Sequence, residues 1–208
     1  MYIPSLEDIV LRLLIILPAL TVHEFAHAYA ADRMGDPTAR MHGRLTLNPL
    51  AHIDPIGTIL VPIFLRFGWA KPVPINPYNF RDPGWGAVIT SVAGPLANLA
   101  EAVVVGLTLR VLLLAPALWT GMEVFLQFLF GLTAVNVMLA IFNLIPLGPL
   151  DGHHILEYYL PYRYKAKYRE INRYGMIIVL IFVFLLPGVL GYVVVGPAIG
   201  AARLLTGI

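Results

Sequence analysis

His23-Glu-Phe-Ala-His27 is the stretch around which the chain is organised, and it lies in an apolar run from Ile9 to Ala31. On a helix, residues four apart lie on one face, one turn above the other. The two imidazoles can therefore reach one metal ion. Glu24, rotated by about 100° from His23, is close enough to handle a water molecule at that ion. A metal site of this kind needs at least one more protein ligand and an open position.

The composition is typical of a membrane protein. Of the 208 residues, 59% are hydrophobic and 12% are charged, and the mean hydropathy is +0.79. A soluble domain is about 45–50% apolar and about 25% charged. The net charge of +2, without a basic tail, gives no indication of nucleic-acid binding. Because the chain has no cysteine, a metal would be held by His, Asp or Glu.

The first apolar segment has one competing interpretation, a cleaved signal peptide. Ala28-Tyr-Ala30 has the small residues of a cleavage site. However, the preceding residues include Glu7 and Asp8, and Arg12 is the only base among them, so the positively charged start is missing. Cleavage would also remove the two histidines. We therefore interpret residues 6–32 as the first membrane span.

The other apolar segments predict an all-α integral membrane protein, with one domain over residues 1–208 and about four to six transmembrane helices. Further spans are expected over residues 85–114, 119–145 and 175–186. Residues 189–208 either complete the last span or form a separate interfacial helix.

Residues 33–82 have a different character, rich in Gly, Pro, Asn and bases. Polar and apolar residues alternate in places over 39–47, as in a short hairpin. The apolar run 56–65 is interrupted by Pro62 and is too short to span a bilayer. We expect a short re-entrant or β-hairpin segment near residues 39–80. Such a backbone is tolerated at membrane depth where protein or a water-filled cavity covers it.

Charge placement predicts the orientation. Residues 33–82 and 153–174 hold six and five of the 14 Lys and Arg residues. By the positive-inside rule both segments face the cytoplasm. The first span then runs inward and the third span returns to the same side. This topology brings the His23–His27 helix and Asp151 to the cytoplasmic end.

Asp151 is the candidate third ligand, because a zinc site without cysteine needs another His, Asp or Glu. The alternative is an ordinary acid that caps the following helix. His52 lies in a turn-rich stretch and could reach the site as a supporting or substrate-side group, or be a surface histidine. The competing metal ligands are His42, His52, Asp54, His153 and His154.

Two further stretches accompany these residues. Asn143-Leu-Ile-Pro-Leu-Gly-Pro-Leu-Asp151-Gly152 carries the candidate ligand, and Gly94-Pro-Leu-Ala-Asn98 lies inside the second span. Together with Asn48-Pro-Leu-Ala-His-Ile-Asp-Pro-Ile-Gly57 and the His23–His27 motif, they occur in the order found in site-2 proteases. The chain resembles that family of intramembrane zinc metalloproteases, in its minimal form without PDZ or CBS domains. Gly148-Pro149 replaces the usual Pro-Pro.

The resemblance implies a role for each matching residue. His23, His27 and Asp151 correspond to the ligands of one zinc ion, and Glu24 corresponds to the catalytic acid and base. Asn143 corresponds to an asparagine that binds the substrate backbone or supports the transition state. Asn98 and His52 are weaker candidates for the same task.

The function expected is hydrolysis of a peptide bond within or near a transmembrane segment of a substrate protein, in a prokaryotic inner membrane. The alternative is a zinc-binding membrane transporter or scaffold without proteolysis. Glu24 argues against this alternative, because a metal site without catalysis does not need that acid. A membrane-anchored peptidase for soluble peptides is a third possibility, disfavoured by the depth of the two histidines in the first span.

Overall fold

A computed structural model describes residues 5–61 and 68–208. Its first long helix, α1 (Leu6–Met34), begins at a capping box, in which Ser5 and Asp8 each accept the other's backbone N–H. It ends at Gly35, whose φ of 113° is the left-handed conformation that glycine adopts without strain. Pro18 lies inside this helix, one turn and a residue before His23.

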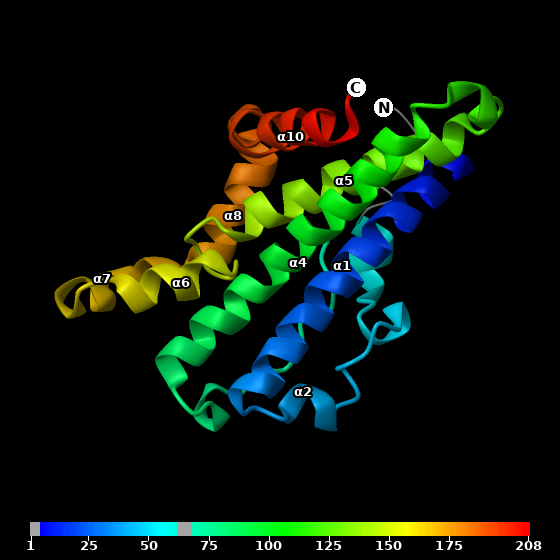
Figure 1. The fold of residues 1–208 in the computed structure, drawn as a ribbon. Coiled ribbons are helices and arrows are strands. Elements are labelled where there is room, and N and C mark those ends of the chain that lie inside the picture. Colours follow the sequence, from blue (N-terminus) through cyan, green and yellow to red (C-terminus); the bar gives the residue numbers. More distant parts are fainter. Residues whose placement is uncertain (1–4, 62–67) are drawn as a thin grey trace.

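Two further long helices complete the centre of the molecule. Asp82 caps α4 (Pro83–Leu112), and its side chain accepts the Trp85 N–H. A short turn, η4 (Pro116–Trp119), leads to α5 (Glu123–Asn143). Figure 1 shows α1, α4 and α5 side by side as a bundle. Apolar side chains of α1 and α5, among them Leu20 and Leu132, form a buried cluster between them.

The remaining helices continue from the end of α5. Figure 1 shows α6 (Gly152–Tyr159) and α7 (Tyr162–Asn172) as an arm that projects from the bundle. The chain then returns through α8 (Gly175–Leu185), α9 (Pro187–Leu190), η5 (Gly191–Val195) and α10 (Gly196–Thr206). Ala198 of α10 packs on Ala102 of α4 and Val137 of α5. Residues 187–206 therefore form a separate helical run that begins after the break at Leu186 and packs against the bundle.

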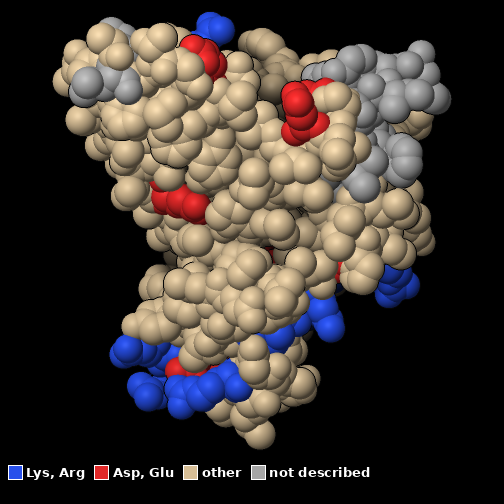
Figure 2. Space-filling model, turned by 90° about the vertical axis from the view of Figure 1, so that its right-hand side faces the viewer, with Lys and Arg blue, Asp and Glu red and all other residues tan. Residues whose placement is uncertain are grey.

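Within the described residues, four helical segments are long and apolar enough to cross a membrane, namely 6–34, 83–112, 123–143 and 187–206, and α8 is a shorter apolar helix. The prediction of an all-α membrane protein is confirmed. Large apolar side chains such as Val104, Val111 and Leu185 are exposed on these helices, as expected of surfaces that face lipid. Figure 2 shows Lys and Arg gathered at the lower end of the molecule, where α1 ends and α4 begins in Figure 1.

The segment between α1 and α4 contains no strand in the described parts of residues 39–80. It forms short helical turns, α2 (Thr38–Met41), η1 (Pro49–Ala51), η2 (Pro55–Leu60) and η3 (Pro77–Asn79). Turns and bends follow α2, and residues 68–76 before η3 form neither helix nor strand. Prolines such as Pro72 and Pro74 lack the N–H that a hairpin ladder requires. The end of the predicted re-entrant run, residues 62–65, lies outside the described residues.

Candidate metal centre and active site

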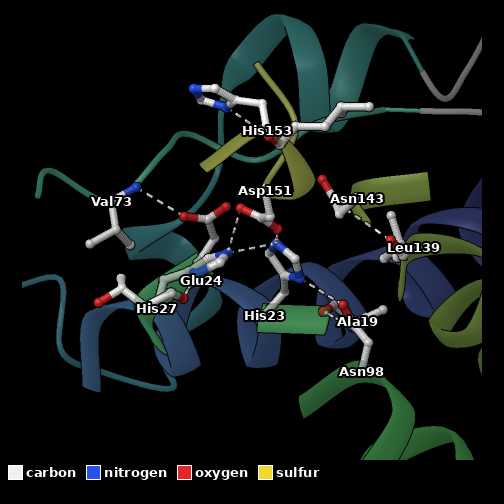
Figure 3. Close-up of polar contacts among 12 residues, drawn as sticks. Ala19, His23, Glu24, His27, Val73, Asn98, Leu139, Asn143, Asp151 and His153 are labelled. Atoms are coloured by element: carbon white, nitrogen blue, oxygen red, sulfur yellow. Dashed lines mark hydrogen bonds and ion pairs between the residues drawn. The ribbon is translucent and has the colours of Figure 1, made fainter. Parts of the chain in front are cut away.

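His23 and His27 lie one turn apart on α1, and both are buried. Their Nε2 atoms are 2.9 Å apart. Asp151, between α5 and α6, faces both rings, with 3.4 Å from Oδ2 to His23 Nε2 and 3.4 Å from Oδ1 to His27 Nε2. The three ligand atoms all lie within 4.8 Å of one another. Figure 3 shows the three side chains converging on one point.

Hydrogen-bond partners on the far side of each ring assign the tautomers. His27 Nδ1 lies 2.7 Å from the carbonyl oxygen of Thr90, which can only accept, so Nδ1 carries the hydrogen. His23 Nδ1 lies 2.7 Å from Asn98 Oδ1. The Asn98 amide nitrogen is committed to the Ala19 carbonyl oxygen at 2.9 Å, so Oδ1 must accept and His23 Nδ1 must donate. In the neutral rings, both Nε2 atoms therefore carry a lone pair and no hydrogen.

These residues fit a metal ion. Two imidazole lone pairs and a carboxylate converge, and Asp151 Oδ2 is buried without a hydrogen-bond partner. Three acceptors at such distances repel one another unless a cation lies among them. Two histidines and one carboxylate are a ligand set typical of catalytic zinc, with a fourth position left for water or substrate. The cluster could therefore bind zinc.

A buried polar ladder supports His23 from behind. Asn98 of α4 and Asn136 of α5 are both fully buried. Asn98 Nδ2 donates to Asn136 Oδ1 at 2.7 Å, and Asn136 Nδ2 donates to the Leu132 carbonyl oxygen at 3.0 Å. Three helices are thereby linked through amide groups to one candidate ligand. Partners of this kind fix the orientation and tautomer of metal-bound histidines.

Glu24 lies on the next position of α1, turned from the histidines. Its Oε2 accepts the backbone N–H of Val73 at 2.9 Å, as Figure 3 shows. Val73 stands between Pro72 and Pro74, which have no N–H, so it is the one backbone donor of that tripeptide. The extended chain before α4 thus holds the Glu24 carboxylate beside the cluster.

Glycine at position 94 makes room for the histidine pair. A Cβ atom there would lie 2.4 Å from His27 Nε2 and 2.6 Å from His23 Cε1. At Gly152, directly after Asp151, a Cβ atom would lie 2.3 Å from the Leu144 carbonyl oxygen. Both glycines permit close approaches that any other residue would obstruct.

The other predicted site residues lie outside the cluster. Asn143, the last residue of α5, is half-buried and donates to the Leu139 carbonyl oxygen at 3.0 Å. Asn98 lies behind His23 rather than on a substrate-facing surface. His52 is buried and pairs through Nε2 with the Thr46 carbonyl oxygen at 2.8 Å. Among the described residues, the one metal cluster found does not include the alternative ligands His42, His52, Asp54, His153 and His154.

Sequence reasoning missed several supporting groups. The Thr90 carbonyl and the Val73 N–H belong to the backbone, which carries no residue-type signal. The two prolines around Val73 were the available indication that one amide is singled out. The signal for Asn136 is a polar residue in an otherwise apolar span. The signal for Gly94 is its place in the Gly94-Pro-Leu-Ala-Asn98 stretch, which does not reveal that its Cβ position faces the histidines.

Comparison with known proteins agrees with this geometry. The pattern of Peptidase family M50 matches residues 115–186. The chain is 42% identical over 195 residues to "Putative zinc metalloprotease YwhC" of Bacillus subtilis, covering 90% of this chain and 85% of the relative. It is 33% identical over 180 residues to "Putative zinc metalloprotease Rip2" of Mycolicibacterium smegmatis, covering 79% of this chain and 63% of the relative. The Rip2 protein of Mycobacterium tuberculosis strain H37Rv is 30% identical over 181 residues, covering 85% and 67%. No solved structure matches the chain. The chain belongs to peptidase family M50, the site-2 protease family.

Proposed function

We propose that the protein is an intramembrane zinc metalloprotease, which hydrolyses a peptide bond within or near a transmembrane segment of a substrate protein. The observation that carries this proposal is the convergence of two bare imidazole nitrogens, from a membrane-length helix, with the Asp151 carboxylate beside Glu24. By the helical rise, His23 lies about 16 Å and His27 about 10 Å from the Met34 end of α1. A substrate must therefore reach into the bilayer.

His23, His27 and Asp151 are the proposed ligands of one zinc ion. The chemistry that a bound zinc ion supplies is Lewis acidity, which polarises a carbonyl and lowers the pKa of a coordinated water towards about 7. Glu24 accepts the proton of the attacking water and returns it to the leaving amine. The Val73 N–H fixes one oxygen of its carboxylate and leaves the other for the proton. Asn143 is proposed to bind the substrate backbone or support the transition state.

The proposed location is a prokaryotic inner membrane, with the active site nearer the cytoplasmic side. Support comes from the 11 of 14 Lys and Arg residues in segments 33–82 and 153–174, counted as six and five. The relatives from bacteria support a prokaryotic membrane. The proposed partners are a transmembrane protein substrate and the lipid bilayer.

The experiment compares the purified full chain with Glu24→Gln and Asp151→Ala on a transmembrane substrate in nanodiscs. Glu24→Gln should retain zinc while cleavage falls by roughly 10²- to 10⁴-fold. Asp151→Ala should lose both zinc and cleavage. Glu7→Gln, the same change in the first turn of α1, is the matched control and should leave both unchanged. Cleavage by Glu24→Gln at the normal rate would overturn the proposal. A soluble peptide cut as fast as the membrane substrate would refute the intramembrane assignment alone.

A further inference from the structure

Helix α7 has two faces with different contacts. Lys165, Tyr168 and Asn172 are its half-buried residues, and their spacing of three and four places them on one side. The rest of the helix is exposed, and none of its residues is fully buried. A helix with so little burial is not held in place by an apolar core. Its position must come from the polar contacts on each face.

The inner face of α7 is hydrogen-bonded to the loop that carries Asp151. Tyr168 Oη donates to the Pro146 carbonyl oxygen at 2.9 Å and lies 3.3 Å from the His153 carbonyl oxygen. Asn172 Oδ1 accepts the Gly148 N–H at 2.8 Å. These contacts fall on both sides of Asp151 in the sequence. Helix α7 therefore acts as a clamp on this loop.

The outer face carries cations. Arg163, Lys167 and Arg173, the last one residue beyond the helix, fall within an arc of about 120°, centred opposite the Tyr168–Asn172 side. The exposed acid Glu170 lies on the same arc. No acidic partner is found for them in the part of the chain that the structure describes, whereas Arg169 pairs with Glu157 at 2.6 Å. Arg163 lies over the ring of Tyr164, 4.6 Å from its centre.

The neighbouring helix indicates what lies against this face. Helix α8 begins at Gly175, three residues after α7 ends, and contains no charged residue. Its Met176, Ile177 and Leu185 are exposed, so they require a hydrocarbon environment. Helix α7 is thus placed where hydrocarbon gives way to lipid headgroups. Tyrosine with Lys and Arg is the composition typical of that level, and the exposed tyrosines of this region are Tyr158, Tyr159, Tyr162, Tyr164 and Tyr174.

We propose that Arg163, Lys167 and Arg173 bind the headgroups of anionic phospholipids, and that this contact holds α7 against the Asp151 loop. Phosphate oxygens supply acceptors for these three bases, none of which forms an ion pair with Glu170 or another acid in the described residues. A lipid-bound α7 keeps Tyr168 and Asn172 in place and so keeps Asp151 directed at His23 and His27. The link to metal binding rests on the proposed function, whereas the lipid contact does not.

The first test measures lipid binding to the full chain. Phosphatidylglycerol and phosphatidylcholine are titrated into detergent-solubilised protein and bound lipids are counted by native mass spectrometry. Replacing Arg163, Lys167 and Arg173 by Gln should weaken phosphatidylglycerol binding by roughly 100-fold, since each base near a charged lipid surface contributes about 1 kcal/mol. The control replaces Arg12, Arg110 and Arg203 by Gln, the three bases outside segments 33–82 and 153–174, and should bind as the wild type does. Inorganic phosphate should not compete.

The second test measures metal retention in nanodiscs. Zinc should dissociate from the wild type roughly tenfold faster in pure phosphatidylcholine than with phosphatidylglycerol present. From the variant without Arg163, Lys167 and Arg173, zinc should dissociate at the faster rate in both lipid mixtures. Tyr168→Phe should also release zinc faster while binding phosphatidylglycerol normally, because it breaks only the clamp.

Normal lipid binding by the triple variant, or competition by free phosphate, would overturn the headgroup site. Loss of lipid binding without any change in zinc release would overturn the clamp. Absence of zinc from the wild type in both lipids would count against the metal site, and the lipid result would stand separately.

Discussion

Asn98 shows how one buried side chain can determine the state of a metal ligand. Both hydrogens of its amide are used, one by the Ala19 carbonyl and one by Asn136, and its oxygen faces His23. Aspartate could not make the two donations. Glutamine would place the amide one methylene too far in a fully enclosed site. Asparagine is therefore the residue that holds His23 with its Nε2 lone pair directed at Asp151.

Gly94 leads to a prediction at the same scale. Gly94→Ala would place a methyl group against the edges of both imidazoles. These rings are buried and cannot move aside without losing Thr90 or Asn98. We expect zinc affinity to fall by roughly 10- to 100-fold, measured by competition with a chelator. Gly200→Ala on α10 is the matched control, because nothing lies within 4 Å of the new atom. Equal zinc affinity in the two variants would contradict this role of Gly94.

The sequence predicted those residues whose geometry follows from helix spacing alone. His23 and His27 face one point because four residues make about one helical turn. Asp151 was predicted by topology and by its match to a zinc ligand of site-2 proteases, and the structure brings it to the pair. The Val73 N–H could not be predicted, because which backbone group meets a side chain depends on a fold between residues 24 and 73.

At the scale of elements, every second backbone N–H of the extended chain before α4, from Trp69 to Val73, donates a hydrogen bond. Trp69 N–H donates to the Gly57 carbonyl oxygen at 3.1 Å, and Lys71 N–H to the His52 carbonyl oxygen at 2.9 Å. Val73 N–H continues the series and donates to Glu24. Alternate residues of an extended chain direct their amides to the same side. The segment therefore delivers its last amide to the candidate catalytic acid.

Removal of that amide should impair the chemistry and leave metal binding intact. Val73→Pro deletes the N–H, and Val73→Ala retains it while shortening the side chain. A hydrogen bond to a charged group contributes about 1.5–3 kcal/mol, so cleavage by the proline variant should fall by roughly 10- to 100-fold. Zinc content and the pH dependence of kcat/KM are measured beside it. An equal loss in the alanine variant would assign the effect to side-chain packing instead.

Asp36 anchors the other end of this segment and gives a pH-dependent prediction. Burial opposes its ionisation, but hydrogen bonds from Thr38, Asn79 and the Asn76 N–H hold the pKa of Asp36 below its usual value. A lowered folded-state pKa stabilises the protein above the unfolded value of about 3.9, and this stabilisation is lost as the pH falls through the folded value. The protection of the amides in residues 75–80 against hydrogen exchange, corrected for the intrinsic pH dependence of the exchange rate, should therefore fall on acidification. Asp36→Asn should exchange fast already at neutral pH and respond less to acid. An unchanged acid response in this variant would assign the effect to another group.

The hairpin alternative for residues 39–80 illustrates the limit of pattern reasoning for elements. Alternation over 39–47 is a correct description of the sequence, but Thr38–Met41 forms a helical turn and no strand occurs in the described residues there. A strand needs a partner with free N–H groups, and the local prolines remove them. The long helices were predicted within a few residues because an uninterrupted apolar run of that length has few alternatives in a membrane.

At the scale of the whole molecule, the cluster joins parts of the chain that are far apart in sequence. Asp151 lies eight residues beyond the end of α5. It nevertheless contacts His27 and His23, which lie about two and three turns before the C-terminal end of α1. The connection after α5 therefore reaches α1 at the depth of the histidine pair. Helix α4 supplies Thr90, Gly94 and Asn98 between them. A metal ion at this point would tie α1 to the α5–α6 connection and hold both against α4.

A bound zinc ion should therefore stabilise the whole fold. At a free concentration of about 100 times its dissociation constant it contributes about 2.7 kcal/mol, which corresponds to roughly 5–10 °C in Tm for a chain of this size. Chelation should lower the Tm of the wild type by this amount. Asp151→Asn should show little response to the chelator, because a neutral amide is a weak zinc ligand. Glu24→Gln should show the full response, because Glu24 is not a proposed ligand. Thermal unfolding of the three proteins in one lipid, with and without chelator, separates the two roles. A chelator response in Asp151→Asn as large as that of the wild type would remove Asp151 from the ligand set.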